Sequence, residues 1–382
     1  MQAEFAMPQW VFGMATIAWD GQRLLAMACE KGRWRLGEVV LSLAADQGST
    51  AAPTAAHWQP LAQPCDDLAS LSAEAGRLAC VASGPSLPSG LLELDLASGA
   101  WTHTPAAPCP LAPEAISVPE ELWFDGHNGQ PTQAWYYPPA GGGHAEAPLL
   151  VKGHSGPTGM ARTGLSLSIQ FWTSRGWGVV DVNYGGSTGF GRAYRERLDG
   201  QWGVVDVDDC LAAALALVTS GRADPQRIAM EGGSAAGFTV LAAMARSDTI
   251  RAGAIRYPVT DLAALAQGDH RFEARYCDSL VGPWPQAQAL YAERSPRHQV
   301  DRLQAPLLVF HGLEDEVIPH AQSRSLVEHL ERRGIPVELR LFEGEGHGFR
   351  GGAVQLEVLE ATEAFFRRHL DLPAPTPAEG KT

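Results

Sequence analysis

Ser234 lies directly between an apolar run of strand length and an apolar run of helix length, in the segment IAMEGGSAAGFTVLAAMAR. Its neighbours Gly232, Gly233, Ala235 and Ala236 are all small. A sharp strand-to-helix turn holds its serine at strained backbone angles, and small neighbouring residues leave room for such a turn. The serine also lies beside a helix N-terminus, where a developing negative charge is stabilised. The segment therefore predicts a nucleophile elbow suited to attack on a carbonyl carbon. It reads G-x-S-x-A rather than G-x-S-x-G, and the alternative is a serine that only caps the helix.

Two further polar residues follow later apolar runs and could activate such a serine. Asp315 comes just after the strand-like run in PLLVFHGLEDEVIP, and His347 lies in the Gly-rich stretch LFEGEGHGF after the next run. The chain order Ser, Asp, His is that of the catalytic triad in α/β-hydrolases. We therefore predict Ser234 as nucleophile, His347 as general base and Asp315 as the group that orients the histidine. The alternatives are Glu314 or Glu316 in place of Asp315, and a loop histidine without a role.

A backbone oxyanion hole is the remaining requirement of acyl transfer, because the tetrahedral intermediate carries a negative charge. The N–H of Ala235, next after the nucleophile, is one expected donor. The loop in LLVKGHSGPTG offers the N–H of Gly156 or of its neighbour Ser155 as the second. His154 in the same loop either lines the substrate pocket or anchors the loop.

The elements that must position these residues are visible from about residue 118 onward, where runs of strand length alternate with segments of helix length. The strand-like runs are LLVK, GVVDVNY, RIAME, AGAIRYP, PLLVFHG and VELRLFEG, and the helix-like segments include SLSIQFWTSRG, VDDCLAAALALVTSG, AGFTVLAAMAR, AQSRSLVEHLERRG and VQLEVLEATEAFFRRHL. This alternation predicts an α/β fold, with a mainly parallel sheet covered by helices on both faces. Functional residues should then lie at the carboxyl ends of the strands.

The first part of the chain, residues 10–105, has short apolar stretches of strand length and is predicted to be all-β. Two stretches resemble each other, GQRLLAMAC ending at VVLSLAADQG and AGRLACVAS ending at LLELDLASG, with Gly48 and Gly99 in matching positions. Their separation of about 50 residues is typical of β-propeller blades, of which two are implied, and a repeat array normally needs about three or more. The chain therefore looks incomplete at its front. A small β-sandwich is the alternative.

The Pro-rich stretch 105–119 is typical of a linker. It divides the chain into a partial propeller with linker at 1–117, a catalytic domain at 118–372 and a flexible tail at 373–382.

The chain has 382 residues and a formal net charge of −14, which would repel phosphate backbones and anionic lipids. Its first twenty residues contain no Lys or Arg, and the longest apolar run, 210–218, is too short to cross a bilayer. We expect no nucleic-acid or membrane partner and a cytoplasmic location. The six cysteines form no C-x-x-C pair, so we expect reduced thiols and no metal.

The chain resembles the prolyl oligopeptidase family of serine peptidases, in its acylaminoacyl-peptidase or dipeptidyl-aminopeptidase-like branch. The resemblance is carried by HSGP, DVNYGGSTGFGRAYRERLDGQWGVVDVDDC, GGSAAGFT, FEARYCDSLVGP, HGLEDEVIP and FEGEGHGFR. It implies the same triad, places the oxyanion donors at Gly156 and Ala235, and implies a pocket for the side chain before the scissile bond. The residues implied for that pocket are Val259, Leu262 and Ile318. The chain departs from the family pattern at Ser155 and Ala236, where the family has glycine. It also contains only about two propeller blades where the family has a complete propeller, which suggests a member truncated at its N-terminus.

These features together predict a cofactor-independent enzyme that cleaves amide bonds near the N-terminus of short peptides, releasing N-acylated amino acids or dipeptides through an acyl-enzyme at Ser234. A promiscuous carboxylesterase is the nearest alternative, because an ester is the easier acyl donor. A catalytically idle fragment that associates with itself through exposed strand edges is the alternative from another class. A metal hydrolase is disfavoured, since no two histidines stand at ligand spacing on one helix.

Overall fold

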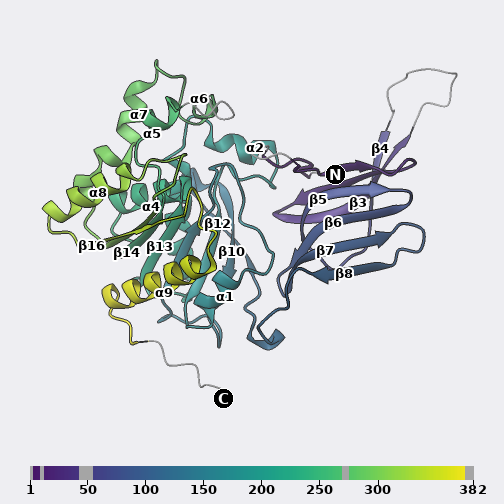
Figure 1. Ribbon diagram of the computed structural model, residues 1–382, viewed down its shortest axis with the longest axis horizontal. Helices are drawn as coiled ribbons and strands as arrows, with labels where there is room; N and C mark the ends of the chain where they lie inside the picture. The colour runs from purple at the N-terminus through teal and green to yellow at the C-terminus, as the bar shows by residue number, and fades with distance from the viewer. Residues whose placement is uncertain (1–2, 9–12, 43–54, 269–274, 375–382) are drawn as a thin grey trace. The chain divides into compact units, whose positions relative to one another are not determined.

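The computed structural model describes residues 3–8, 13–42, 55–268 and 275–374 (Figure 1). The chain forms two compact units, of which the first comprises Met1–Val118, Arg162–Leu167 and Thr188–Tyr194. The second comprises Pro119–Ala161, Ser168–Ser187 and Arg195–Thr382. Gly48 of the repeat comparison and residues 375–382 of the predicted tail lie outside the described residues.

Two short segments from later in the chain belong to the first unit and form hydrogen bonds with residues of its first 70 positions. The guanidinium of Arg162 donates to the carbonyl of Leu68 at 2.8 Å, and the hydroxyl of Thr163 donates to the Asp66 carboxylate at 2.9 Å. The N–H of Gly189 donates to the Glu4 carboxylate at 2.6 Å. These contacts join residues about 100 or more positions apart, so nothing local in the sequence indicated them.

The first unit contains two four-stranded antiparallel sheets, in each of which consecutive strands are neighbours. The first sheet is β1 (Ile17–Trp19), β2 (Leu24–Glu30), β3 (Arg33–Ser42) and β4 (Ala55–Pro60), and the second is β5 (Asp67–Glu74), β6 (Arg77–Gly84), β7 (Leu87–Asp95) and β8 (Trp101–Pro105). A four-stranded meander is the unit from which propellers are built. The predicted all-β, partly propeller-like segment is confirmed.

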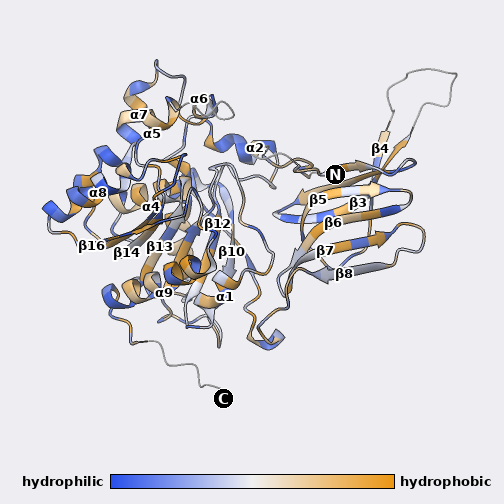
Figure 2. Cartoon of the chain, viewed as in Figure 1, coloured by the Kyte–Doolittle hydropathy of each residue, from blue (hydrophilic) through white to orange (hydrophobic). Residues whose placement is uncertain are grey.

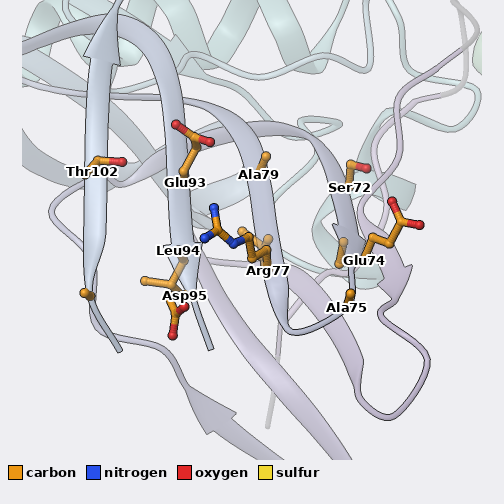
Figure 3. Close-up of a pocket in the computed structure, with 12 residues that line it drawn as sticks. Ser72, Glu74, Ala75, Arg77, Ala79, Glu93, Leu94, Asp95 and Thr102 are labelled. Atoms are coloured by element: carbon orange, nitrogen blue, oxygen red, sulfur yellow. The ribbon is translucent and has the colours of Figure 1, made fainter. Parts of the chain in front are cut away.

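The second of these sheets has one buried and one open face. Leu78, Cys80 and Leu92 are buried, whereas Val81 and Leu91 on the other face are each 46% exposed. The amino end of β6 and the facing end of β7 border a shallow hollow of about 640 Å³ (Figure 3). The residues that line it include none of the predicted site residues.

The second unit is built on one eight-stranded sheet in the order β16-β15-β14-β13-β11-β12-β10-β9. The strands are β9 (Glu120–Asp125), β10 (Pro131–Tyr137), β11 (Leu149–Gly153), β12 (Gly178–Asn183), β13 (Ile228–Gly233), β14 (Ala252–Arg256), β15 (Leu307–Gly312) and β16 (Val337–Phe342). Every pairing from β12 to β16 is parallel, whereas β9 and β10 extend the sheet antiparallel. The six parallel strands had been predicted, and the antiparallel pair had not.

Helices cover both faces of this sheet (Figure 1). The larger core lies under α3 (Val205–Thr219), α4 (Ala235–Arg246) and α8 (Ala321–Arg332), and the smaller core lies under α1 (Leu167–Thr173) and α9 (Gly352–His369). Three shorter helices also contribute buried residues to the larger core: α5 (Leu262–Ala266), α6 (Tyr276–Leu280) and α7 (Gln288–Arg294). A further short helix is α2 (Arg192–Arg195). Figure 2 shows α8 in both blue and orange, as expected for a helix with one buried side and one exposed side. The α/β-hydrolase architecture is confirmed.

All six cysteines are present as thiols, and five of them are buried. Among the described residues, no helix combines the length and the apolar character needed to span a bilayer.

Candidate active site

Ser234 stands at the turn between β13 and α4 with φ 53° and ψ −121°, a strained conformation for a residue with a side chain. A Cβ atom at Gly232 would lie 2.6 Å from the backbone of Ala236, and one at Gly233 would lie 3.0 Å from the ring of Tyr257. The methyl group of Ala236 occupies the space that Gly232 leaves, and Ala236 is 1% exposed. The departure from G-x-S-x-G is thus accommodated within the turn.

The Ser234 hydroxyl makes no capping hydrogen bond to α4, so the alternative of a simple helix cap is wrong. Its Oγ instead lies 3.0 Å from Nε2 of His347, in the loop after β16. Nδ1 of His347 lies 2.9 Å from Oδ2 of Asp315, in the loop after β15. The three predicted side chains therefore form one hydrogen-bonded chain at the carboxyl ends of three strands, and neither Glu314 nor Glu316 takes the place of Asp315.

The Asp315 side chain has no exposed surface and is fully engaged. Its Oδ1 accepts the N–H groups of Val317 at 2.9 Å and Ile318 at 2.8 Å, while His311 lies 3.2 Å from Oδ2. Burial alone would raise the pKa of Asp315, but hydrogen bonds from His311, His347 and Ile318 hold this pKa well below its usual range. The carboxylate is therefore ionised and can stabilise a histidine that takes up a proton.

The loop after β11 places Gly156 with a φ of 106°, which a residue with a side chain rarely adopts. The carbonyl of Gly156 accepts the hydroxyl of Tyr276 at 2.5 Å, and that hydroxyl lies 2.6 Å from Oγ1 of Thr158. Ser155 donates from its Oγ to the carbonyl of Gly233 at 2.6 Å, so the serine that replaces the expected glycine ties this loop to the elbow. The predicted donors, the N–H groups of Gly156 and Ala235, thus belong to two loops that are joined directly.

His154 packs against the loop base. Its ring stacks on Tyr184 with 4.2 Å between centroids, and its Nε2 lies 2.6 Å from Oγ of Ser187. Burial lowers the pKa of His154 to about 4, so the ring is neutral at pH 7. These contacts favour the loop-anchoring alternative over a contact with substrate.

The three side chains implied for a substrate pocket all lie in the larger core. Val259 and Ile318 are each 2% exposed, and Leu262 has no exposed surface. A pocket at this place therefore requires these side chains to move, and their role stays a prediction.

Two tyrosines that contact the loops of the site were not predicted as site residues from the sequence. Tyr257 has a φ of 37°, and its ring lies 4.8 Å from that of His347 between centroids. Burial raises the pKa of Tyr257, so this ring presents a neutral phenol to the imidazole. Tyr276, at the start of α6, holds the loop after β11 through its hydrogen bond to the Gly156 carbonyl. Tyr276 lies within FEARYCDSLVGP, which contributes to the family resemblance, but nothing in that segment indicated its contact with the loop after β11.

Comparison with known proteins places these residues in context. Residues 163–373 match the prolyl oligopeptidase family. The chain is 30% identical over 211 residues to dipeptidyl aminopeptidase BIII of Pseudoxanthomonas mexicana, which covers 54% of this chain and 31% of that protein. It is 30% identical over 208 residues to an acylamino-acid-releasing enzyme of Arabidopsis thaliana, which covers 52% of this chain and 27% of that protein. The chain thus spans less than a third of the length of these curated relatives.

Among solved structures, a puromycin-hydrolyzing peptidase of Mycobacterium tuberculosis superposes with a TM-score of 0.87 at 38% sequence identity. That match covers 97% of this chain and 56% of the other. Both units of this chain thus have counterparts in one longer protein.

Proposed function

Because the chain belongs to the prolyl oligopeptidase family, we propose that it hydrolyses amide bonds near the N-terminus of short peptides through an acyl-enzyme on Ser234. The observation that carries the proposal is the hydrogen-bonded chain from Ser234 through His347 to Asp315, at 3.0 and 2.9 Å. A buried carboxylate, an imidazole and a strained serine in this order have the roles of orienting group, base and nucleophile.

In the acylation step, Oγ of Ser234 bonds to the carbonyl carbon while its proton passes to Nε2 of His347. The N–H groups of Gly156 and Ala235 stabilise the resulting oxyanion. His347 then gives its proton to the leaving amine, and the carbon–nitrogen bond breaks. Water then attacks the acyl-enzyme ester and gives its proton to His347. The bond between the acyl carbon and Oγ breaks, His347 returns the proton to Ser234, and the carboxylic acid is released. Asp315 holds the imidazole in the tautomer that can accept the serine proton.

The substrate class is proposed from the relatives. One of them releases dipeptides and another releases acylated amino acids, by their names, and the similar solved structure is of an enzyme that hydrolyses puromycin. All three names imply a short acyl or aminoacyl group joined to an amine. We therefore propose short peptides with a free or acylated N-terminus as substrates and a cytoplasmic setting, with simple esters also accepted chemically.

A fluorophosphonate probe tests the nucleophile. The protein should be labelled stoichiometrically, and Ser234→Ala should abolish labelling. Ser220→Ala, which changes an exposed serine at the end of α3, should leave it intact. Labelling that survives in Ser234→Ala would reject the assignment.

Side-by-side assays then test the substrate class. Acylaminoacyl, dipeptidyl and aminoacyl arylamides, puromycin and a p-nitrophenyl ester are compared at equal enzyme concentration. Turnover of an arylamide or of puromycin is the expected result. Turnover of the ester alone would favour the carboxylesterase alternative, and no turnover together with no labelling would favour the idle fragment.

A further inference from the structure

Four charged side chains lie together on one face of the eight-stranded sheet, near the carboxyl ends of its central strands. Lys152 on β11 is the register partner of Asp181 on β12 and of Glu231 on β13. Arg256, at the end of β14, lies two residues beyond Ala254, which is the partner of Glu231. Register partners share a face of the sheet, and so do residues two apart on one strand. All four side chains therefore belong to the face that is covered by α1 and α9.

Glu231 is the centre of this group. Its Oε1 accepts a hydrogen bond from Nζ of Lys152, and its Oε2 lies 3.4 Å from Nη1 of Arg256. The Glu231 side chain is 2% exposed, that of Lys152 is 17% exposed and that of Arg256 is 22% exposed. Burial opposes the charge on Glu231, but the two cations lower its pKa to about 2. One ionised carboxylate thus links three adjacent strands.

The same strands lead directly into the candidate active site. Four residues after Lys152 the chain reaches Gly156, and three residues after Glu231 it reaches Ser234. The backbone carbonyl of Arg256 accepts the N–H of Ser234 at 2.9 Å. Glu231 and the Lys152 and Arg256 side chains that it binds therefore lie within four residues of Gly156 or on strands that contact the Ser234 backbone.

We propose that Glu231, held between Lys152 and Arg256, is a positioning residue that sets the oxyanion loop at its working distance from Ser234. This role rests on the proposed hydrolytic function. Oxyanion donors act only when they lie close to the place where the negative oxygen forms, and a shift of about 1 Å between groups of an active site can cost about 100-fold in rate. Apolar side chains would hold the strands together without direction, whereas a carboxylate with a cation on each side also fixes their register along the sheet.

The alternative is that the group only stabilises the fold, since breaking a buried ion pair destabilises a protein wherever it lies. The chain offers a matched control for this alternative. Glu363 on α9 is also buried between two cations, with Arg175 at 3.1 Å and Arg367 at 2.9 Å, and its side chain is 7% exposed. Within the described part of the chain, its ion pairs are with arginines and with none of the predicted catalytic or oxyanion residues.

The test compares Glu231→Gln with Glu363→Gln, using kcat and KM for a p-nitrophenyl ester, the rate of fluorophosphonate labelling and the thermal midpoint. Both variants should melt at a lower temperature than the wild type. Only Glu231→Gln should lower kcat and the labelling rate, by about 10- to 100-fold, with KM nearly unchanged. Lys152→Arg, which keeps a cation beside Glu231, should retain most of the wild-type kcat.

Equal losses of kcat in the two glutamine variants, or a wild-type kcat in Glu231→Gln, would overturn the proposal. If Glu231→Gln does not fold, Arg256→Gln decides, because it removes one cation from a more exposed position and should lower kcat with little change in melting. Failure of the wild type to react with the probe would reject the hydrolytic function itself, so the two failures are distinguishable.

Discussion

Replacement of Asp315 by asparagine tests the catalytic arrangement at its most constrained point. The carboxylate presents Oδ1 to two backbone N–H groups, from Val317 at 2.9 Å and Ile318 at 2.8 Å, and Oδ2 to Nδ1 of His347 at 2.9 Å. An asparagine has one acceptor and one donor end. Since the two backbone donors need an acceptor, the amide oxygen must occupy the Oδ1 position, and the NH₂ group must face His347 and also His311, whose Nε2 lies 3.2 Å from Oδ2.

This forced orientation reverses the hydrogen bond to the imidazole. Nδ1 of His347 then has to accept from the NH₂ group, which leaves the proton of the neutral ring on Nε2. A protonated Nε2 cannot take the proton of Ser234. The substitution is nearly isosteric, so the loss should be one of tautomer and charge, with the geometry of the site retained.

The expected loss in kcat is about 10⁴-fold, or about 5 to 6 kcal/mol in the activation barrier, which is the effect of the wrong tautomer in a Ser-His-Asp triad. The assay is ester hydrolysis at saturating substrate, with the thermal midpoint measured in parallel. Asp301→Asn is the matched control, because Asp301 also bonds a histidine, His329, at 2.8 Å but is 83% exposed. A kcat for Asp315→Asn within about tenfold of the wild type would refute the tautomer argument.

Three further outcomes follow from contacts around the site. Ser155→Ala removes the hydrogen bond to the Gly233 carbonyl and should lower kcat by about fivefold to tenfold, with KM nearly unchanged in steady-state assays. Gly232→Ala places a methyl group 2.6 Å from the Ala236 backbone, so it should cost about 1 to 3 kcal/mol and lower the thermal midpoint in calorimetry. Burial raises the pKa of Asp181 from its usual 3.8 to about 6. The folded state therefore holds this proton more tightly than the unfolded state, so the free energy of unfolding falls as pH rises from about 4 to about 6, by up to about 3 kcal/mol. Asp181→Asn lacks this loss and should melt higher than the wild type at pH 8 but not at pH 4, whereas an equal difference at both would contradict the assignment.

The triad could be predicted because each of its members carries a local signal. Ser234 is marked by small neighbours between a strand and a helix, while Asp315 and His347 each follow an apolar run in the order that the fold requires. In a parallel sheet the carboxyl ends of all strands meet at one edge, so position along the chain predicts proximity in space. The antiparallel strands β9 and β10 lacked such a signal, because they precede the alternating pattern from which the sheet was read.

The substrate pocket carried no comparable signal. Val259, Leu262 and Ile318 were inferred from the family resemblance alone, and an apolar side chain that lines a pocket cannot be distinguished by sequence from one that fills a core. The structure buries all three at 2% exposure or less. For His154 two roles were open, and only the stacked ring of Tyr184 and the Ser187 hydroxyl favoured one of them.

The charged group around Glu231 could not be predicted from the sequence, because its contacts depend on the register between strands. In the sequence, LLVKG, AMEGG and AIRYP each read as a buried strand with one charged residue near its end, and parallel strands covered on both faces do not show which side that residue takes. Lys152 and Glu231 meet only because they are register partners on β11 and β13. A slip of one residue would turn Lys152 toward the opposite core, where Val151 now lies, and would leave Glu231 without its closest cation. The ion pair between Lys152 and Glu231 thus depends on the register of the whole sheet. Because β11 leads into the proposed oxyanion loop and β13 into Ser234, the same ion pair depends on the relative position of the two strands that carry these groups.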